Sequence, residues 1–223
     1  MELSLDTASV LASIALSREG RAVAERSWEC HRNHTVELLP AIDRMLGENG
    51  VAKGDLSAVF VSTGPGMYTG LRVGISIAKG LACALRLATV GVGRLELDAY
   101  AQRGFDGDIL AVHRAGRGDL AWAAYRDEPW REVGAPRLTT ADELVGAVTV
   151  RTLFVGEIDD GLREVLTQRL GTLADFASPT AIGRATALAE IGHQLLAAGL
   201  GDEPALLKAI YLRPPAIGPQ PAV

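Results

Sequence analysis

The stretch FVSTGPGMYTGLRVGISIAKGLA, residues 60–82, carries the clearest fold signal in the chain. The hydrophobic run from Val59 to Val61 is typical of a buried strand, and the Gly64–Gly66 segment after it predicts a tight loop. Residues 69–85 then predict a helix, because apolar residues recur there at helical spacing. A strand, a glycine-rich loop and a helix in this order present backbone N–H groups where an anion can bind.

Neither of the two common nucleotide-binding loops fits these residues. A Walker A loop needs a glycine, four residues of any type and then Gly-Lys-Ser/Thr. No register of the loop supplies that sequence. A dinucleotide fingerprint needs glycine at 64, 66 and 69, but the third position is Thr69. The loop is therefore not a standard nucleotide site.

Small residues recur every four positions along this predicted helix. They are Gly70, Gly74, Ala78 and Ala82, with Arg72 and Lys79 beside the stripe. A glycine costs a helix about 1 kcal/mol relative to alanine, so a close contact should offset that cost. Two interpretations stay open: the stripe packs on the chain's own sheet, or it forms a helix–helix interface with another chain.

The residues around this unit predict a two-lobed α/β fold. Upstream, three short strands within residues 3–30 form an antiparallel meander, and a helix starts at Asn33 or Thr35. Its expected apolar face is Val36, Leu38, Leu39, Ile42, Met45 and Leu46. Strands at 56–61 and 89–92 flank the loop and helix described above. This order is the opening of the actin/hexokinase/Hsp70-like (ASKHA) fold, in which each lobe has a mixed sheet flanked by helices.

The second half repeats the pattern more weakly. Strands at 109–112 and 120–125 surround a turn at 116–119, and a loop containing Pro129 and Pro136 follows. Thr140 caps a short helix through residue 145, residues 153–155 predict a strand, and residues 179–200 predict a long helix. We therefore expect an N-terminal lobe at 1–104, a C-terminal lobe at 105–213, and an extended proline-rich tail at 214–223.

Composition narrows the classes of function. The formal charge is −5 and the pI is about 5.4, so the chain lacks the basic balance of a protein that grips nucleic acid by itself. Cys30 and Cys83 are far apart and form no metal or redox motif. The first residues do not read as a signal peptide, and no stretch reaches transmembrane length. We expect a cytoplasmic protein.

Candidate chemical residues are sparse. His31 and His34 lie at helical spacing, but no further ligand completes a metal site, so we expect a solvated pair at a helix start. His113 and His193 have no supporting acid pattern, and the acidic pairs at 142–143, 159–160 and 202–203 are typical of solvated helix starts. No nucleophile motif is found.

Asp6-Thr7 follows the first strand and has two interpretations. In actin-like ATPases an acid at this point lies near the metal of the nucleotide, which makes Asp6 and Thr7 candidates for a vestigial nucleotide loop. The alternative is a strand end with local side-chain hydrogen bonding.

The residues above resemble the TsaB family, also called YeaZ. The resemblance rests on GPGMYTGLRVGISIAKGLA, on the Asp6-Thr7 opening, on His34-Thr35 with Leu38-Leu39-Pro40, and on Tyr211-Leu212-Arg213. It is strong over residues 1–100 and thin over 101–205. One departure lies at residues 114–119, where family members often begin the turn with an acid and this chain has Arg114.

The resemblance implies a non-catalytic paralogue of TsaD, the subunit that transfers threonylcarbamoyl to N6 of adenosine 37 in tRNA. It implies that the N-terminal lobe binds TsaD through Gly70, Arg72, Gly74, Ala78 and Lys79, that TsaE joins the pair, and that homodimers form. It implies no intrinsic cofactor and no metal site, with ATP or ADP and metal on TsaD and TsaE. Membrane contact and sequence-specific tRNA binding are not expected.

Two alternatives compete with this hypothesis. One is an independent enzyme of the same fold, either an ATP-dependent phosphotransferase or a metallopeptidase; the other is a self-associating binding module. If the small-residue stripe is an interface, Gly74→Leu should weaken association and leave the fold mostly intact. Loss of folding would favour internal packing.

Overall fold

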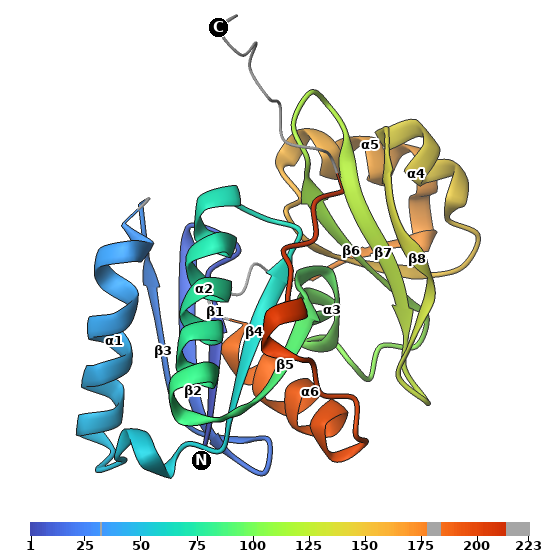
Figure 1. The fold of residues 1–223 in the computed structure, drawn as a ribbon. Helices are drawn as coiled ribbons and strands as arrows, with labels where there is room; N and C mark the ends of the chain where they lie inside the picture. Colours follow the sequence, from blue (N-terminus) through green and yellow to red (C-terminus); the bar gives the residue numbers. More distant parts are fainter. Residues whose placement is uncertain (32, 178–183, 213–223) are drawn as a thin grey trace, which may run out of the picture.

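Two five-stranded mixed sheets form the two lobes of the protein (Figure 1). The structure is a computed structural model, and it describes residues 1–31, 33–177 and 184–212. The first sheet has the order β3-β2-β1-β4-β5 and the second the order β10-β9-β6-β7-β8. Both sheets therefore combine an antiparallel meander with parallel strands, as the actin-like fold requires.

The first sheet is formed as its sequence pattern predicts. Its strands are β1 (Glu2–Asp6), β2 (Leu11–Arg18), β3 (Arg21–Glu29), β4 (Ala58–Gly64) and β5 (Ala88–Gly93). Strands β1, β2 and β3 pair antiparallel, whereas β4 pairs parallel with both β1 and β5. The meander and the buried strand before the glycine loop are confirmed.

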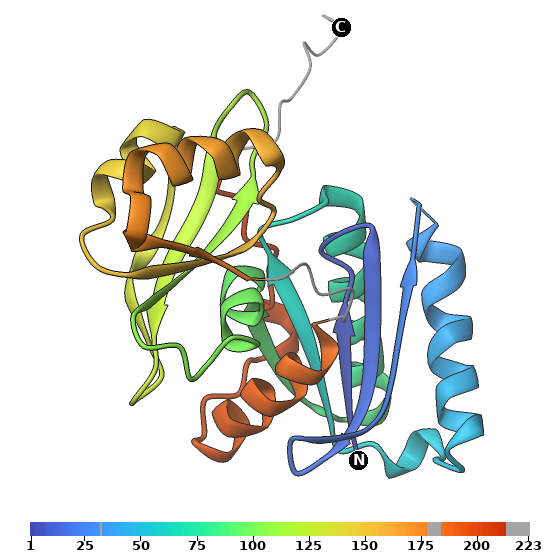
Figure 2. The same ribbon diagram turned by 180° about the vertical axis from the view of Figure 1, so that it is seen from behind.

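Helices cover both faces of this sheet. On one face lie α1 (His34–Glu48) and α2 (Tyr68–Leu85), which pack against Val59 and Val61 (Figure 1). On the other face lies α6 (Ala185–Ala197), packed against Phe60 (Figure 2). Consecutive residues of β4 point to opposite faces, because side chains alternate along a strand. A strand buried on both faces reads as a continuous apolar run, which is what residues 58–61 show.

The second sheet is covered in the same way. Its strands are β6 (Asp108–Arg114), β7 (Leu120–Arg126), β8 (Arg131–Thr139), β9 (Thr152–Gly156) and β10 (Ala174–Phe176). Helices α4 (Ala141–Ala147) and α5 (Asp160–Leu170) pack on one face, and α3 (Arg94–Tyr100) packs on the other. Short 3-10 turns lie at Lys53–Asp55, Gly171–Leu173 and Pro204–Leu206. Because α3 also contacts β4 and β5, it lies between the two lobes.

Several predictions for the second half are corrected. The segment expected to be a loop around Pro136 is strand β8. Helix α3 was not predicted, and of α5 only the acidic start at 159–160 was expected. The long helix expected at 179–200 is observed as α6 from Ala185 to Ala197; its expected first residues, 179–183, and the proline-rich tail lie outside the described residues. The Thr140 cap is confirmed, with Glu143 completing a capping box.

The expected lobe boundary also changes. Residues 105–213 do not form one C-terminal lobe, because α6 packs on the first sheet and contacts all five of its strands. The hydroxyl of Ser13 accepts a hydrogen bond from the Ala185 N–H at 3.1 Å and so anchors the start of α6. The first lobe is therefore built from both ends of the described chain.

Candidate functional site

The small-residue stripe of α2 faces the chain's own sheet. Gly70, Gly74 and Ala78 are buried, and a Cβ added at Gly74 would overlap the Thr7 hydroxyl oxygen. The same hydroxyl donates a hydrogen bond to the Gly70 carbonyl at 2.8 Å. The prediction that these three positions contact another chain is therefore wrong, because they pack inside the protein.

A different row of α2 faces outward. Arg72, Ser76, Gly80 and Ala84 are all exposed and lie four positions apart, and a Cβ added at Gly80 would meet nothing within 4 Å. Four-residue spacing places these side chains on one helix face. The sequence contained this second small-residue row, but periodicity alone did not show which row pointed inward.

The two cations that flank the stripe have different surroundings. Arg72 donates to the Tyr68 hydroxyl at 2.6 Å and lies on the outer face. Lys79 donates to the Ala205 carbonyl at 3.1 Å, so it ties α2 to the segment after α6. Of the two, Arg72 is the one on the exposed face of α2.

Helix α1 adds apolar residues to the same side of the molecule. Leu38, Ile42, Met45 and Leu46 form its buried face, whereas Val36 is 71% exposed and Leu39 is 50% exposed. The prediction that all six residues share one packed face is therefore wrong for these two. Asn33 lies at the N-cap without a side-chain cap bond, and His34 is buried rather than solvated.

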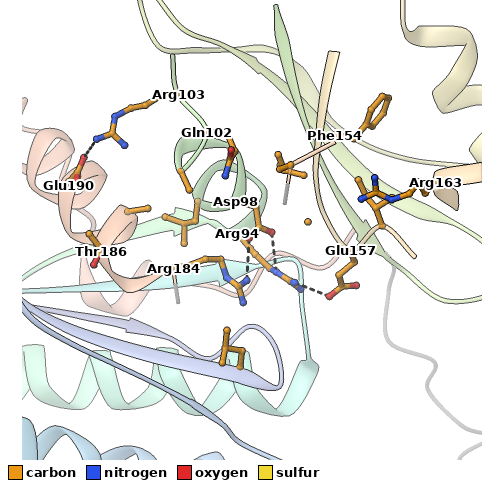
Figure 3. A pocket seen from close by; sticks show the side chains of 18 residues that line it. Arg94, Asp98, Gln102, Arg103, Phe154, Glu157, Arg163, Arg184, Thr186 and Glu190 are labelled. Carbon is orange, nitrogen blue, oxygen red and sulfur yellow. Dashed lines mark hydrogen bonds and ion pairs between the residues drawn. The ribbon is translucent and has the colours of Figure 1, made fainter. Parts of the chain in front are cut away.

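A cavity of about 480 Å³ lies between the lobes (Figure 3). Its lining comes from α3, the turn after β9, α5 and α6, and includes Arg94, Asp98, Glu157, Arg163 and Arg184. Figure 3 shows the Arg94 and Arg184 side chains side by side, next to Asp98. Of these five lining residues, all except Arg163 form ion pairs with one another.

Arg184 joins α6 to the end of β1. Its Nε lies 2.7 Å from Asp6 Oδ2, its Nη1 lies 3.2 Å from Asp98 Oδ1, and its Nη2 donates to the Ser9 hydroxyl at 2.6 Å. Burial disfavours the charged guanidinium, but the carboxylates of Asp6 and Asp98 outweigh burial and raise the pKa of Arg184.

Arg94 continues the ionic contacts into the second lobe. Its Nε lies 3.5 Å from Asp98, and its Nη2 donates to Glu157 at 2.8 Å. Glu157 also lies 2.9 Å from His113. Burial alone would raise the pKa of Glu157, but the His113 hydrogen bond and the Arg94 charge outweigh it and hold that pKa well below its ordinary value.

These contacts correct the prediction that the histidines lack acidic partners. His113 pairs with Glu157, and His193 lies 2.7 Å from Glu2. Sequence reasoning missed both pairs because their members lie far apart in the chain. Asp159 does cap α5, as expected of an acid at a helix start, and it also pairs with Arg114. That pair gives Arg114 a structural partner in the turn that departs from the family pattern.

The geometry does not fit a metal–nucleotide at Asp6. The carboxylate is fully buried and its oxygens are used by the Ala8 N–H and by Arg184. In the part of the chain that the structure describes, no cluster of three or more His, Cys, Asp or Glu residues could hold a metal ion. In the same part, no helix is long and apolar enough to span a membrane.

Comparison with known proteins identifies the family. A family model described as TsaD, tRNA N6-adenosine threonylcarbamoyltransferase, matches residues 28–148. A Haemophilus influenzae protein named tRNA threonylcarbamoyladenosine biosynthesis protein TsaB is 36% identical over 194 residues, which cover 81% of each chain. The chain belongs to the TsaB family. A Bacillus subtilis TsaB is 38% identical over 124 residues, 56% of this chain and 54% of the relative. The matched region thus spans about half the length of that relative.

Solved structures agree with this family assignment. YeaZ from Pseudomonas aeruginosa has a TM-score of 0.79 and 27% identity, covering 95% of this TsaB-family chain and 99% of that one. The activator of 2-hydroxyisocaproyl-CoA dehydratase from Clostridium difficile has a TM-score of 0.54, 11% identity, and coverage of 89% and 96%. The second likeness shows the fold alone. The TsaB relatives are named for tRNA threonylcarbamoyladenosine biosynthesis, and the fold is the actin-like one predicted from the sequence.

Proposed function

We propose that this TsaB-family chain is a non-catalytic accessory subunit that binds and activates TsaD. The reaction it supports is transfer of threonylcarbamoyl to N6 of adenosine 37 in tRNA. It needs no cofactor of its own; ATP or ADP and metal belong to TsaD and TsaE, and TsaE joins the pair. Homodimers form through the surface that binds TsaD, and they dissociate when TsaD binds.

The observation that carries this proposal is the outer surface of α1 and α2. We call it the α1–α2 surface and define it by Val36, Leu39, Arg72, Ser76 and Gly80. The two apolar side chains on α1 are exposed, and α2, which contacts α1, exposes small residues that let a partner helix approach closely. Arg72 supplies a cation at its edge. Such a surface fits a helical face with an acidic group opposite Arg72.

The cleft between the lobes supports a non-catalytic role. A phosphotransferase of this fold would bind a metal–nucleotide there and place a general base beside it. Here the charges of the cleft are engaged with one another: buried Asp6 with Arg184, and partly exposed Glu157 with Arg94 and His113. Fluorescent ATP with magnesium, titrated into the isolated protein, should therefore show no saturable binding; saturable binding would favour the independent enzyme.

The first test is reconstitution of tRNA modification. Purified cognate TsaD, TsaE and threonylcarbamoyl-AMP synthase are incubated with tRNA, with and without this protein, and modified adenosine is quantified by mass spectrometry. Product that depends on the protein supports the proposal. Equal product in both reactions contradicts it.

A glycine substitution tests the surface. Gly80→Arg places a long charged side chain on the α1–α2 surface, where the added Cβ meets nothing within 4 Å. We expect the fold to persist, TsaD binding to weaken by at least tenfold in titration calorimetry, and modification to fall with it. The matched control is Gly146→Arg in α4, where an added Cβ is equally free. Equal binding by both variants would show that the TsaD interface does not include this part of the α1–α2 surface.

A further inference from the structure

The end of β1, the turn after it and α3 together form a buried cation site. Asp6 and Asp98 contribute two carboxylates, whose side chains are 0% and 10% exposed, and Ser9 contributes a hydroxyl oxygen. Burying two carboxylates away from water costs free energy unless a cation pairs with them. The site therefore requires a positive charge as part of the folded structure.

The chain supplies that charge itself. All three guanidinium nitrogens of Arg184 are engaged, each by a different group: Nε by Asp6, Nη1 by Asp98 and Nη2 by Ser9. The planar fork of arginine spreads its donors over three nitrogens, whereas all the donors of a lysine ammonium lie on one nitrogen. The Ser13 hydroxyl, accepting from the Ala185 N–H, fixes the backbone that carries Arg184.

We infer that Arg184 is the built-in ligand of this cation site and takes the place beside Asp6 that a metal–nucleotide would need. The site is therefore satisfied by the chain alone and closed to magnesium and to nucleotide phosphate. Through Asp98 it is also continuous with Arg94, Glu157 and His113. Alternating charges thus run from the first sheet, past α3, to the second sheet.

The inference has a chemical-rescue test. Arg184→Ala leaves Asp6 and Asp98 without their cation, so the Tm should fall by roughly 6–20 °C, the range for removing one partner of a buried ion pair in a domain of this size. Guanidinium chloride at low millimolar concentration should restore part of that loss in a saturable way. Sodium chloride at the same ionic strength should not.

The matched control is Arg163→Ala. Arg163 lines the same cavity, but its guanidinium lies over the Phe176 ring at 4.3 Å and not between carboxylates. Guanidinium should not raise the Tm of this variant or of the wild-type protein. An equal response in the Arg184 and Arg163 variants, or a wild-type Tm for Arg184→Ala, would overturn the assignment.

If Arg184→Ala does not fold, Arg184→Lys carries the test. The single ammonium of lysine cannot contact Asp6, Asp98 and Ser9 at the three positions that the guanidinium nitrogens occupy. Asp98→Asn should therefore lower the Tm of the Arg184→Lys protein by less than it lowers the Tm of the wild-type protein. The same loss in both backgrounds would show that Asp98 and Arg184 are not coupled, which contradicts the inference.

Discussion

Gly74 and Gly80 lie on one helix and have opposite surroundings. A Cβ at Gly74 would overlap the Thr7 hydroxyl, whereas a Cβ at Gly80 would point into open space. Gly74→Ala should therefore lower the free energy of unfolding by about 1–3 kcal/mol through overpacking. Gly80→Ala should raise it by up to about 1 kcal/mol through helix propensity. Urea unfolding of the two variants measures these changes. A Gly74→Ala variant as stable as the wild-type protein would contradict the packing described above. Because the larger leucine side chain would overlap Thr7 further, Gly74→Leu is expected to abolish folding.

At this same scale, residues close in sequence were predictable and distant partners were not. The Thr140 cap and the Asp159 cap follow from local patterns, because each side chain bonds a backbone group three residues away. Arg184 and Asp6 lie 178 positions apart, and nothing in local spacing connects them. The α2 stripe was recognised, but its direction depends on Thr7, which belongs to another element.

At the scale of elements, the turn between β9 and α5 holds the second lobe to α3 through Glu157. Because the pKa of Glu157 is lowered in the fold, its contribution to stability is present above its ordinary pKa of 4.5 and is lost as pH falls below that value. In the Glu157→Gln variant, the free energy of unfolding should therefore decrease less steeply as the pH falls below 4.5. Measurements across the acid range test this, with Glu164→Gln, an exposed site on α5, as the control. The same acid decline in both variants would contradict the role of Glu157.

Element prediction succeeded where periodicity was strong. The apolar repeat identified α2, and the continuous run at 59–61 identified β4 as a buried strand. Strand β8 was missed because Pro136 signalled a loop, yet proline is tolerated in an edge strand, and β8 lies at the edge of its sheet. Helix α3 was missed because it is only seven residues long and faces both lobes, so it shows little amphipathic contrast.

At the scale of the whole molecule, the two lobes should unfold together. Helix α6 belongs to the first lobe although it follows the second in sequence, and ionic contacts cross the cleft. The three tryptophans allow a test. One double variant, Trp122→Phe with Trp130→Phe, leaves Trp28 in the first lobe; the other, Trp28→Phe with Trp130→Phe, leaves Trp122 in the second. We expect the same urea midpoint from both, as for a two-state transition; two separate midpoints would show independent lobes.

The return of α6 to the first sheet has a consequence for biosynthesis. The ribosome completes β5 long before α6 emerges, because the entire second lobe is translated between them. At about 5–20 residues per second, that interval is on the order of 5–20 s. Throughout it, the nascent chain presents the uncovered apolar face that contains Phe60 and Val90. That face is where a ribosome-associated chaperone would act on this protein, and the exposure ends only when α6 has emerged from the ribosome and packed on the sheet.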